Sequence, residues 1–241
     1  MCRFFSAIAT RDGRLLYHDA TDSHEHMIRH FGLREGSGAG FGAANFVCLE
    51  FIQQNGKADD PDSYTLTVDE SETPVWFDAD RRTETISKLK SEIKSMIVTD
   101  SRPFILGGRW ILSGKPTIGK LVGATIEYAG NATIEDAGNA TIKYANNATI
   151  KHAGDATIKD AGNATIKYAN SATIKDAGDA TIKYANNATI EYAGSATIEY
   201  ANSATIEYAG DATIEHANSA TIKYANNATI KDAGDATIIK K

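Results

Sequence analysis

Four histidines lie in one short segment of the chain: His18, His24, His26 and His30. If this segment forms a helix, His26 and His30 are one turn apart and share a face. Imidazole nitrogens bind zinc, but a zinc site needs further ligands, and Glu25 does not have the placement of the glutamate in a His-Glu-x-x-His pattern. We therefore expect surface histidines on a capped helix, with no metal and no cofactor, and keep a metal site as the alternative.

Other reactive groups do not combine into a recognisable active site. Cys48 lies in an apolar run, which indicates a buried thiol rather than a nucleophile. Residues 114–120 have the spacing of a Walker A loop, but Leu121 replaces the hydroxyl residue that binds magnesium, so we interpret them as a linker. We expect no enzyme; an active site in residues 1–113 is the less favoured alternative. Its side chains would be His24, His26, Cys48 and Asp78.

Regularly spaced tyrosines form a second candidate site. They are Tyr128, Tyr144, Tyr168, Tyr184, Tyr192, Tyr200 and Tyr208. Aromatic rings combine apolar faces with a polar tip and are common at binding surfaces, where a sugar or a protein can pack on them. The tyrosines therefore suggest a binding module as the alternative function. The regularly spaced threonines suggest ice binding as a further alternative function. It is less favoured because the neighbouring outward position is charged.

These tyrosines belong to an eight-residue repeat. From residue 124 the triplet Ala-Thr-Ile returns every eighth residue, without insertion or loss, as far as residues 236–238. A fixed period means that each copy occupies an equivalent place in a stack of coils. Eight residues match neither the helical repeats nor a coiled coil. The repeat predicts a mainly β fold with a C-terminal parallel β-solenoid.

Each octad should form one short strand and one corner. Threonine and isoleucine are β-branched and favour strands. Alternation points Ala124 and Ile126 inward and Thr125 and Glu127 outward. The next position accepts Tyr, Asp and His, so we expect the strand to end before it and a corner to begin there. Gly130 fits such a corner because glycine tolerates positive φ.

The isoleucines should stack into a dry interior. The first members of this core ladder are Ile126, Ile134, Ile142, Ile150 and Ile158. Two or three octads could complete a coil; we favour two, because an interior of isoleucine and alanine is thin and suits two closely packed sheets. Seven or so coils, at about 4.8 Å each, would give a rod roughly 35 Å long.

The charged position of the octad changes sign in blocks. It is Glu at 127 and 135, Lys from 143 to 183, Glu from 191 to 215, and Lys at 223 and 231. Like charges beside one another in a parallel stack repel. Contact with an oppositely charged block of another copy is one explanation of the blocks, and a history of duplication is the other.

Residues 1–113 have ordinary complexity and should form a small α/β (α+β) domain that caps the rod, which occupies residues 114–241. Two strands flank the turn at Asp12-Gly13. A capping box at residues 22–25 should open a short helix, and a helix of about 18 residues should follow residues 74–77. The other expected features are a glycine-rich loop from Gly36 to Gly42, strands at 45–52, 63–69 and 103–112, and a degenerate first octad at 116–118.

Composition limits the partners and the compartment. The chain has 241 residues and a net charge of −6, with no basic patch that would bind nucleic acid directly. No apolar stretch is long enough to span a membrane. The start turns polar too soon for a signal peptide, and two cysteines do not make a disulfide framework, so a cytoplasmic location is expected.

The octads, together with residues 3–8, 21–25 and 107–112, resemble uncharacterised bacterial or prophage proteins with an octapeptide-repeat β-solenoid tail. The resemblance implies the architecture and a possible phage association, and no activity. We expect a non-enzymatic, self-assembling structural protein, whose rigid rod serves as a scaffold or as a building block of a filament. Its expected partner is itself, as a homo-oligomer or end to end.

Overall fold

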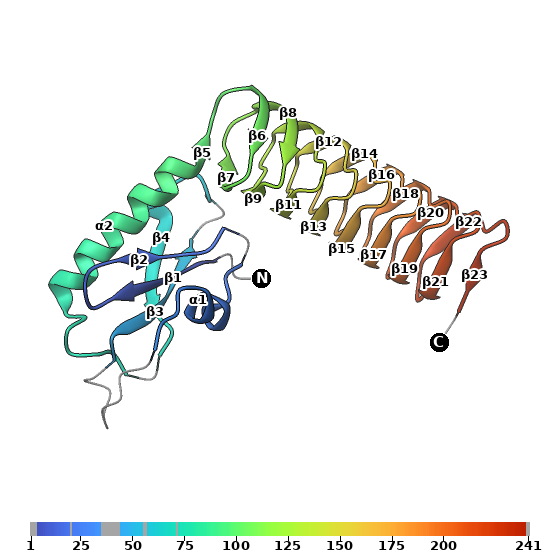
Figure 1. Cartoon of the computed structure of the whole chain (residues 1–241). Helices are drawn as coiled ribbons and strands as arrows, with labels where there is room; N and C mark the ends of the chain where they lie inside the picture. Colours follow the sequence, from blue (N-terminus) through green and yellow to red (C-terminus); the bar gives the residue numbers. More distant parts are fainter. Residues whose placement is uncertain (1–3, 20, 35–43, 55–56, 71, 240–241) are drawn as a thin grey trace. The chain divides into compact units, whose positions relative to one another are not determined.

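The computed structural model describes residues 4–19, 21–34, 44–54, 57–70 and 72–239. The chain divides into two compact units, Met1–Met96 and Ile97–Lys241, and each is described by itself (Figure 1). The glycine-rich segment from Gly36 to Gly42, Cys2 and the two C-terminal lysines lie outside the described residues.

The N-terminal unit is an antiparallel sheet with two helices. Its elements are β1 (Phe4–Thr10), β2 (Leu15–Leu16), α1 (His24–His30), β3 (Phe46–Gln53), a 3-10 turn (Pro61–Ser63), β4 (Tyr64–Val68) and α2 (Ala79–Met96). The strand order is β2-β1-β3-β4. β1 and β2 form the hairpin that Asp12-Gly13 predicts, with Ile8 opposite Leu16.

Both helices form where their sequences indicate, but α1 is capped by Ser23 and not through the expected box of Asp22 and Glu25, since Glu25 pairs with Arg29. The Ser23 hydroxyl caps α1 by accepting a hydrogen bond from the His26 amide at 3.2 Å, which satisfies one of the free amides of the first turn. Met27 is the fully buried residue of α1. Leu89, Ile93 and Met96 are buried along one face of α2, at helical spacing.

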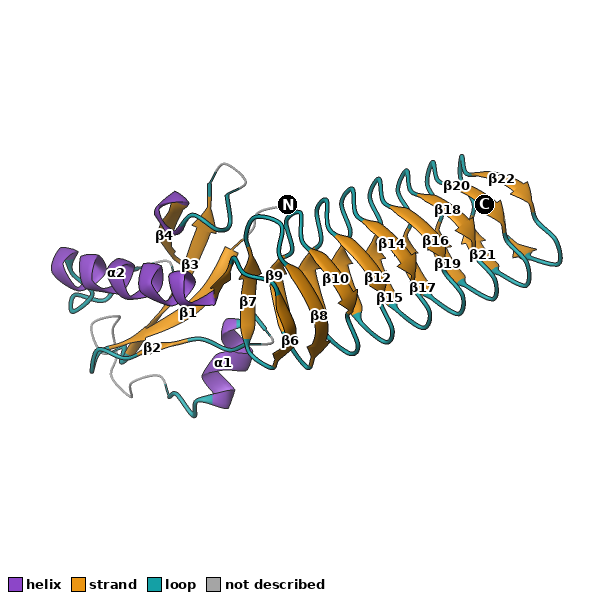
Figure 2. Ribbon diagram, turned by 90° about the horizontal axis from the view of Figure 1, so that it is seen from above, coloured by secondary structure: helices purple, strands orange, loops and turns teal. Residues whose placement is uncertain are grey.

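The second unit is a parallel β-solenoid with two sheets, seen from above in Figure 2. Its first strands are β5 (Ile97–Val98), β6 (Arg102–Leu106), β7 (Arg109–Leu112) and β8 (Thr117–Val122). The repeat strands are β9 (Thr125–Tyr128), β10 (Thr133–Asp136), β11 (Thr141–Tyr144), β12 (Thr149–His152), β13 (Thr157–Asp160), β14 (Thr165–Tyr168), β15 (Thr173–Asp176), β16 (Thr181–Tyr184), β17 (Thr189–Tyr192), β18 (Thr197–Tyr200), β19 (Thr205–Tyr208), β20 (Thr213–His216), β21 (Thr221–Tyr224), β22 (Thr229–Asp232) and β23 (Thr237–Ile238). Successive octads alternate between the sheets. We call them the even sheet, from β6 to β22, and the odd sheet, from β5 to β23.

Two octads make one coil, as the thin interior predicted. Ile134 pairs with Ile150 in the even sheet, and Ile142 with Ile158 in the odd sheet, so each residue stacks on the one sixteen positions later. Among the described residues the solenoid completes about nine turns. At ~4.8 Å between strands, the stack is roughly 40 Å long.

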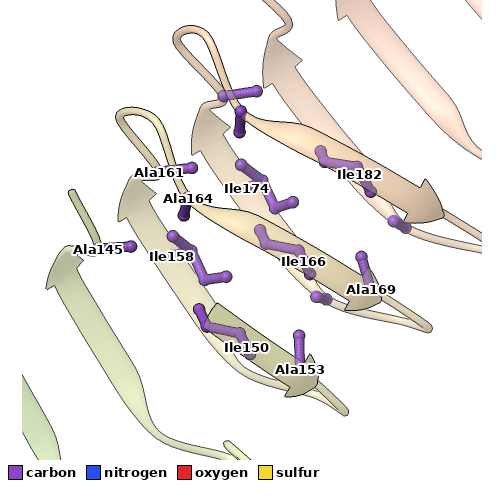
Figure 3. Packing of buried hydrophobic residues seen from close by; sticks show 14 of the residues in the cluster. Ala145, Ile150, Ala153, Ile158, Ala161, Ala164, Ile166, Ala169, Ile174 and Ile182 are labelled. Atoms are coloured by element: carbon purple, nitrogen blue, oxygen red, sulfur yellow. The ribbon is translucent and has the colours of Figure 1, made fainter. Parts of the chain in front are cut away.

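Isoleucine and alanine fill the space between the sheets. Figure 3 shows Ile150, Ile166 and Ile182 of one sheet facing Ile158 and Ile174 of the other, with alanines at the ends of the slab. The expected core ladder is confirmed. Its members Ile126, Ile134, Ile142, Ile150 and Ile158 are all fully buried. Because alanine is small, the chain can turn at each end of the slab without opening a cavity.

The strands are displaced by one residue from the expected bounds. The strands from β9 to β22 each begin at threonine and include the Tyr/Asp/His position, where we expected the corner to begin. The backbone pairing continues past this position, since the Ala129 amide donates to the Tyr144 carbonyl at 2.9 Å. Side chains at this position are mostly half-buried or exposed, so it accepts both rings and carboxylates without placing them in the core.

The corners come in two backbone forms. In the glycine corners the positive φ falls on glycine, as at Gly194 (φ 60°), whereas in Asn170-Ser171 it falls on Ser171 (φ 57°). The two forms also hydrogen-bond in opposite directions along the stack. The Asp179 amide donates back to Gly162 of the previous coil, and the Ser203 amide donates forward to Asn218 of the next, each at 2.9 Å.

The solenoid starts earlier than the boundary expected between residues 113 and 114. The second unit begins at Ile97, and the single strand expected at 103–112 is two strands, β6 and β7, one in each solenoid sheet. Arg102 pairs with Ile118, and Ile97 pairs with Ile111, in parallel. These strands lack the Ala-Thr-Ile triplet, but parallel pairing joins backbone groups and does not require that triplet.

Candidate functional site

His24 has a structural place at the start of α1. Its Nδ1 lies 3.0 Å from an Asp69 carboxylate oxygen, and its Nε2 lies 3.1 Å from the Leu49 carbonyl. Both ring nitrogens therefore face oxygen atoms of other segments. This arrangement ties α1 to the sheet and leaves neither nitrogen directed at a substrate.

Cys48 lies in β3 opposite Ile8 and is 8% exposed. Burial, together with the nearby carboxylates of Glu70 and Asp69, raises the pKa of the Cys48 thiol to about 12. A nucleophilic cysteine needs the thiolate. The expected buried thiol is confirmed.

Cys48 should therefore react slowly with iodoacetamide at pH 8. An ordinary thiol has a pKa of about 8.5, so its thiolate fraction at this pH is roughly a thousandfold larger. In a Cys2→Ser variant we expect alkylation of the folded chain to be more than about a hundredfold slower than in 8 M urea, measured by mass spectrometry. Equal rates would show that the thiol is accessible and ionised.

The candidate catalytic residues of the N-terminal unit have separate roles. Asp78 caps α2, where its carboxylate accepts a hydrogen bond from the Arg81 amide at 2.9 Å. His26 packs against His18 and His30, as described below. His24 and Cys48 are held as described above. These positions favour structural roles.

The Tyr/Asp/His position forms a column of stacked rings on the even sheet. The rings belong to His152, Tyr168, Tyr184, Tyr200 and His216. Neighbouring centroids are 4.9–5.1 Å apart, and the planes differ by 8–11°. Asp136 and Asp232 occupy the same position on either side of the rings. The His216 Nδ1 lies 3.3 Å from the Asp232 carboxylate.

The odd sheet carries a shorter column. Tyr192, Tyr208 and Tyr224 stack with centroids 5.0 and 4.7 Å apart, and Asp160 and Asp176 precede them along the sheet. The tyrosines proposed from the sequence are therefore divided between two sheets. Tyr168, Tyr184 and Tyr200 lie on the even sheet, and Tyr128, Tyr144, Tyr192 and Tyr208 on the odd sheet.

Stacking also affects what the tyrosines can bind. Rings at about 5 Å cover each other's faces within a run, so a sugar packing on a ring face would have to displace a neighbour. The ring edges and hydroxyls, rather than the faces, are the parts of a stacked tyrosine that a partner could contact. This geometry gives less support to a carbohydrate site than the sequence alone.

On the even sheet, ion pairs form where a block of glutamates borders a block of lysines. Lys151 lies 2.8 Å from Glu135, and Lys231 lies 2.7 Å from Glu215. The latter hydrogen bond lowers the pKa of the Glu215 carboxyl. Within the lysine block, the ammonium groups of Lys167 and Lys183 lie 5.2 and 5.5 Å from the ring centroids of the tyrosines that follow them. Cation–π attraction thus offsets part of the repulsion between neighbouring lysines.

The first coils of the odd sheet contain a buried cluster of three charged side chains that the sequence did not indicate. Glu127 binds the Arg109 guanidinium and lies 2.9 Å from the Lys143 ammonium. The side chains of Arg109, Lys143 and Glu127 are 0%, 5% and 13% exposed. Glu127 and Lys143 occupy the outward position that is exposed or half-exposed farther along the solenoid. Arg109 lies outside the octads, so the repeat pattern gave no signal for it.

Neither helix in the described part of the chain is long and apolar enough to cross a membrane. No protein-family model matches this sequence, and neither does any curated protein or solved structure.

Proposed function

We propose that this chain is a structural protein whose rigid solenoid associates with a second copy through the even sheet, the two rods lying antiparallel. The observation that supports the proposal is the order of side chains from β10 to β22 of this sheet. About β16, the charged residues are opposite in sign on the two sides, and the Tyr/Asp/His residues are the same on both sides. A parallel solenoid held by continuous backbone pairing and a dry core is suited to a mechanical role, because each coil is fixed by its neighbours.

The charged residues of the even sheet form a column whose signs, read from one end, are opposite to its signs read from the other end, except at the central residue. In order along the even sheet it is Glu135, Lys151, Lys167, Lys183, Glu199, Glu215 and Lys231. When a second copy lies antiparallel, Glu135 faces Lys231 of that copy, Lys151 faces Glu215, and Lys167 faces Glu199. Each of these pairs occurs twice by symmetry, and Lys183 alone faces a like charge, its own counterpart.

The Tyr/Asp/His position next to the charged one forms a second column, and its order of residue types is the same when read from either end. It is Asp136, His152, Tyr168, Tyr184, Tyr200, His216 and Asp232, with Tyr184 at its centre. Both columns are therefore centred on one strand. A two-fold axis along β16, in the plane of contact, reverses the rod but keeps each column against the same column of the partner. Closed two-fold interfaces of this kind are the commonest in soluble homo-oligomers.

Identical spacing makes the match extend from β10 to β22. Two copies share the same distance between strands, so a register that is correct at β16 is also correct at β10 and β22. Exposed ion pairs contribute only about 0.2–1 kcal/mol each and are weakened by salt. The association should accordingly need all the pairs together and should depend on ionic strength.

Sedimentation velocity of the full chain over a range of concentrations tests the proposal. We expect a concentration-dependent dimer at low salt that weakens in 0.5 M NaCl. Lys167→Glu places a carboxylate opposite Glu199 of the partner at both symmetric contacts and should give monomers. Lys167→Glu with Glu199→Lys restores the opposite charges and should restore the dimer.

Lys175→Glu makes the same charge change on the odd sheet, in strand β15, and is the matched control. It should leave the dimer intact. Lys183→Gln removes the one like-charge contact and should tighten association. Monomers at every concentration at low salt, or equal effects of the exchanges at 167 and 175, would overturn the proposed interface.

A further inference from the structure

We propose that His18, His26 and His30 form a binding site for a divalent transition-metal ion, with zinc as the physiological candidate. Each histidine offers one ring nitrogen, and the three nitrogens lie within 4.8 Å of one another. The site is in the N-terminal unit and is independent of the proposed dimer of the solenoid.

Separate segments bring these rings together. His26 and His30 come from successive turns of α1, and their rings are nearly parallel, 6.2 Å between centroids and 14° between planes. His18 follows β2, and its ring lies nearly perpendicular to both, at 79° and 90°, with centroids at 5.0 and 4.8 Å. The sequence indicated the helical pair. That His18 completes the group with this pair is evident only from the fold, which places His18 beside both rings.

The geometry is close to that of a three-histidine site. A tetrahedral zinc ion with Zn–N bonds of about 2.0–2.1 Å holds its ligand nitrogens roughly 3.4 Å apart. The nitrogens must therefore approach one another by up to about 1.4 Å (4.8 minus 3.4 Å), a movement that side-chain rotation can supply. His26 and His30 are exposed and His18 is half-buried, so an ion can reach the nitrogens from solvent.

The backbone around the site is held by contacts that do not involve the three rings. Ser23 caps α1, and the buried Met27 anchors the helix. His24 ties the same helix to Asp69 at 3.0 Å, and a β-bridge joins His18 to Thr21. A site whose ligands sit on a fixed backbone loses less conformational entropy when the ion binds.

The ligand set selects the class of ion. Three imidazoles without a thiolate suit zinc, copper, nickel or cobalt, whereas calcium and magnesium prefer oxygen ligands. Three protein ligands leave a fourth position for water or for a group of a partner. Imidazole binds as the neutral form, so protons compete with the ion at acidic pH.

Isothermal titration calorimetry of the full, untagged chain with zinc chloride tests the site. We expect one ion per chain and micromolar or tighter binding, which weakens from pH 7.5 to pH 5.5. His18→Ala should reduce the affinity at least tenfold. Arg29→Ala, which removes an exposed side chain of the same helix that is not a proposed ligand, is the matched control and should leave zinc binding unchanged.

Two further measurements separate a three-ligand site from weaker alternatives. Cobalt should give the intense visible absorption of a four-coordinate ion in the unaltered chain, and His18→Ala should lose it, while circular dichroism checks that this variant remains folded. Equal zinc affinity in the unaltered chain and in His18→Ala would mean that only the helical pair His26 and His30 binds, and the proposed site would be wrong. Absence of zinc binding at pH 7.5 would overturn it as well.

Discussion

Replacing Ile166 by alanine is expected to lower the free energy of unfolding by about 2–5 kcal/mol. Ile166 is fully buried in the middle of the even sheet, between Ile150 and Ile182 in its ladder. The opposite sheet meets it with Ile158 and Ile174 (Figure 3). The slab holds only isoleucine and alanine at this point, so no larger neighbour can fill the space that the lost atoms leave.

Ile230→Ala is the matched control, because Ile230 occupies the same position of the octad in β22 but is only partly buried. We expect a clearly smaller loss there. Urea unfolding followed by far-ultraviolet circular dichroism, extrapolated to water, gives both values. If the two variants lose the same free energy, the continuous isoleucine seam does not dominate the stability of the rod.

Gly194→Ala is expected to cost about 2–4 kcal/mol, for two separate reasons. Gly194 has a φ of 60°, a left-handed conformation that a Cβ atom disfavours. A Cβ added there would also lie 2.7 Å from the carbonyl oxygen of Gly178 in the preceding coil. That oxygen belongs to the backbone and accepts a hydrogen bond from Ser195, so it cannot move without breaking the stack of corners.

Asn170→Ala tests whether the left-handed backbone causes this loss. Asn170 holds the same position of its octad, but it is exposed and its φ is not positive, because its corner places the positive φ on Ser171. We expect a change within about 0.5–1 kcal/mol. Thermal unfolding of the two variants side by side is sufficient. Comparable losses at 170 and 194 would mean that the loss does not depend on the backbone form of the corner.

The corners show that neighbours in the stack influence the backbone of each octad. On the odd-sheet side, Asn146 and Asn226 adopt φ values of 53° and 44° at the position that glycine fills in the adjacent coils. On the even-sheet side, the Asn-Ser and Asn-Asn corners stack on one another and share the other form. A corner that matches the one below it keeps the hydrogen bond between coils, and this gain offsets the strain of a left-handed asparagine.

The even sheet links this architecture to the proposed function. The charge blocks repel within the column, apart from the junction pairs such as Lys231 and Glu215. A fold selected for stability alone would alternate the signs. In the proposed dimer, the reversed complement along β10–β22 gives the blocks a role in association; a history of duplication is the other explanation. The experiments on Lys167 and Glu199 distinguish these explanations.

The repeat unit by itself determined the local structure of the solenoid. Alternation of Ala124, Thr125 and Ile126 set which side chains face inward, because neighbouring strand residues point to opposite sides of the sheet. The absence of any slippage in the period required equivalent, stacked coils. The helix at 24–30 and the burial of Cys48 were also readable, since capping and apolar runs are local signals.

Tertiary structure decided which residues meet. Pairing at a spacing of sixteen puts Tyr168 beside Tyr184 and divides the tyrosines between two sheets, and this pairing joins backbones that are distant in sequence. It also added β5, β6 and β7 to the rod without the triplet and brought His18 to the helical pair of histidines. A sequence specifies local conformation through short-range sterics, whereas columns and sites arise from contacts whose register is fixed only when the whole stack forms.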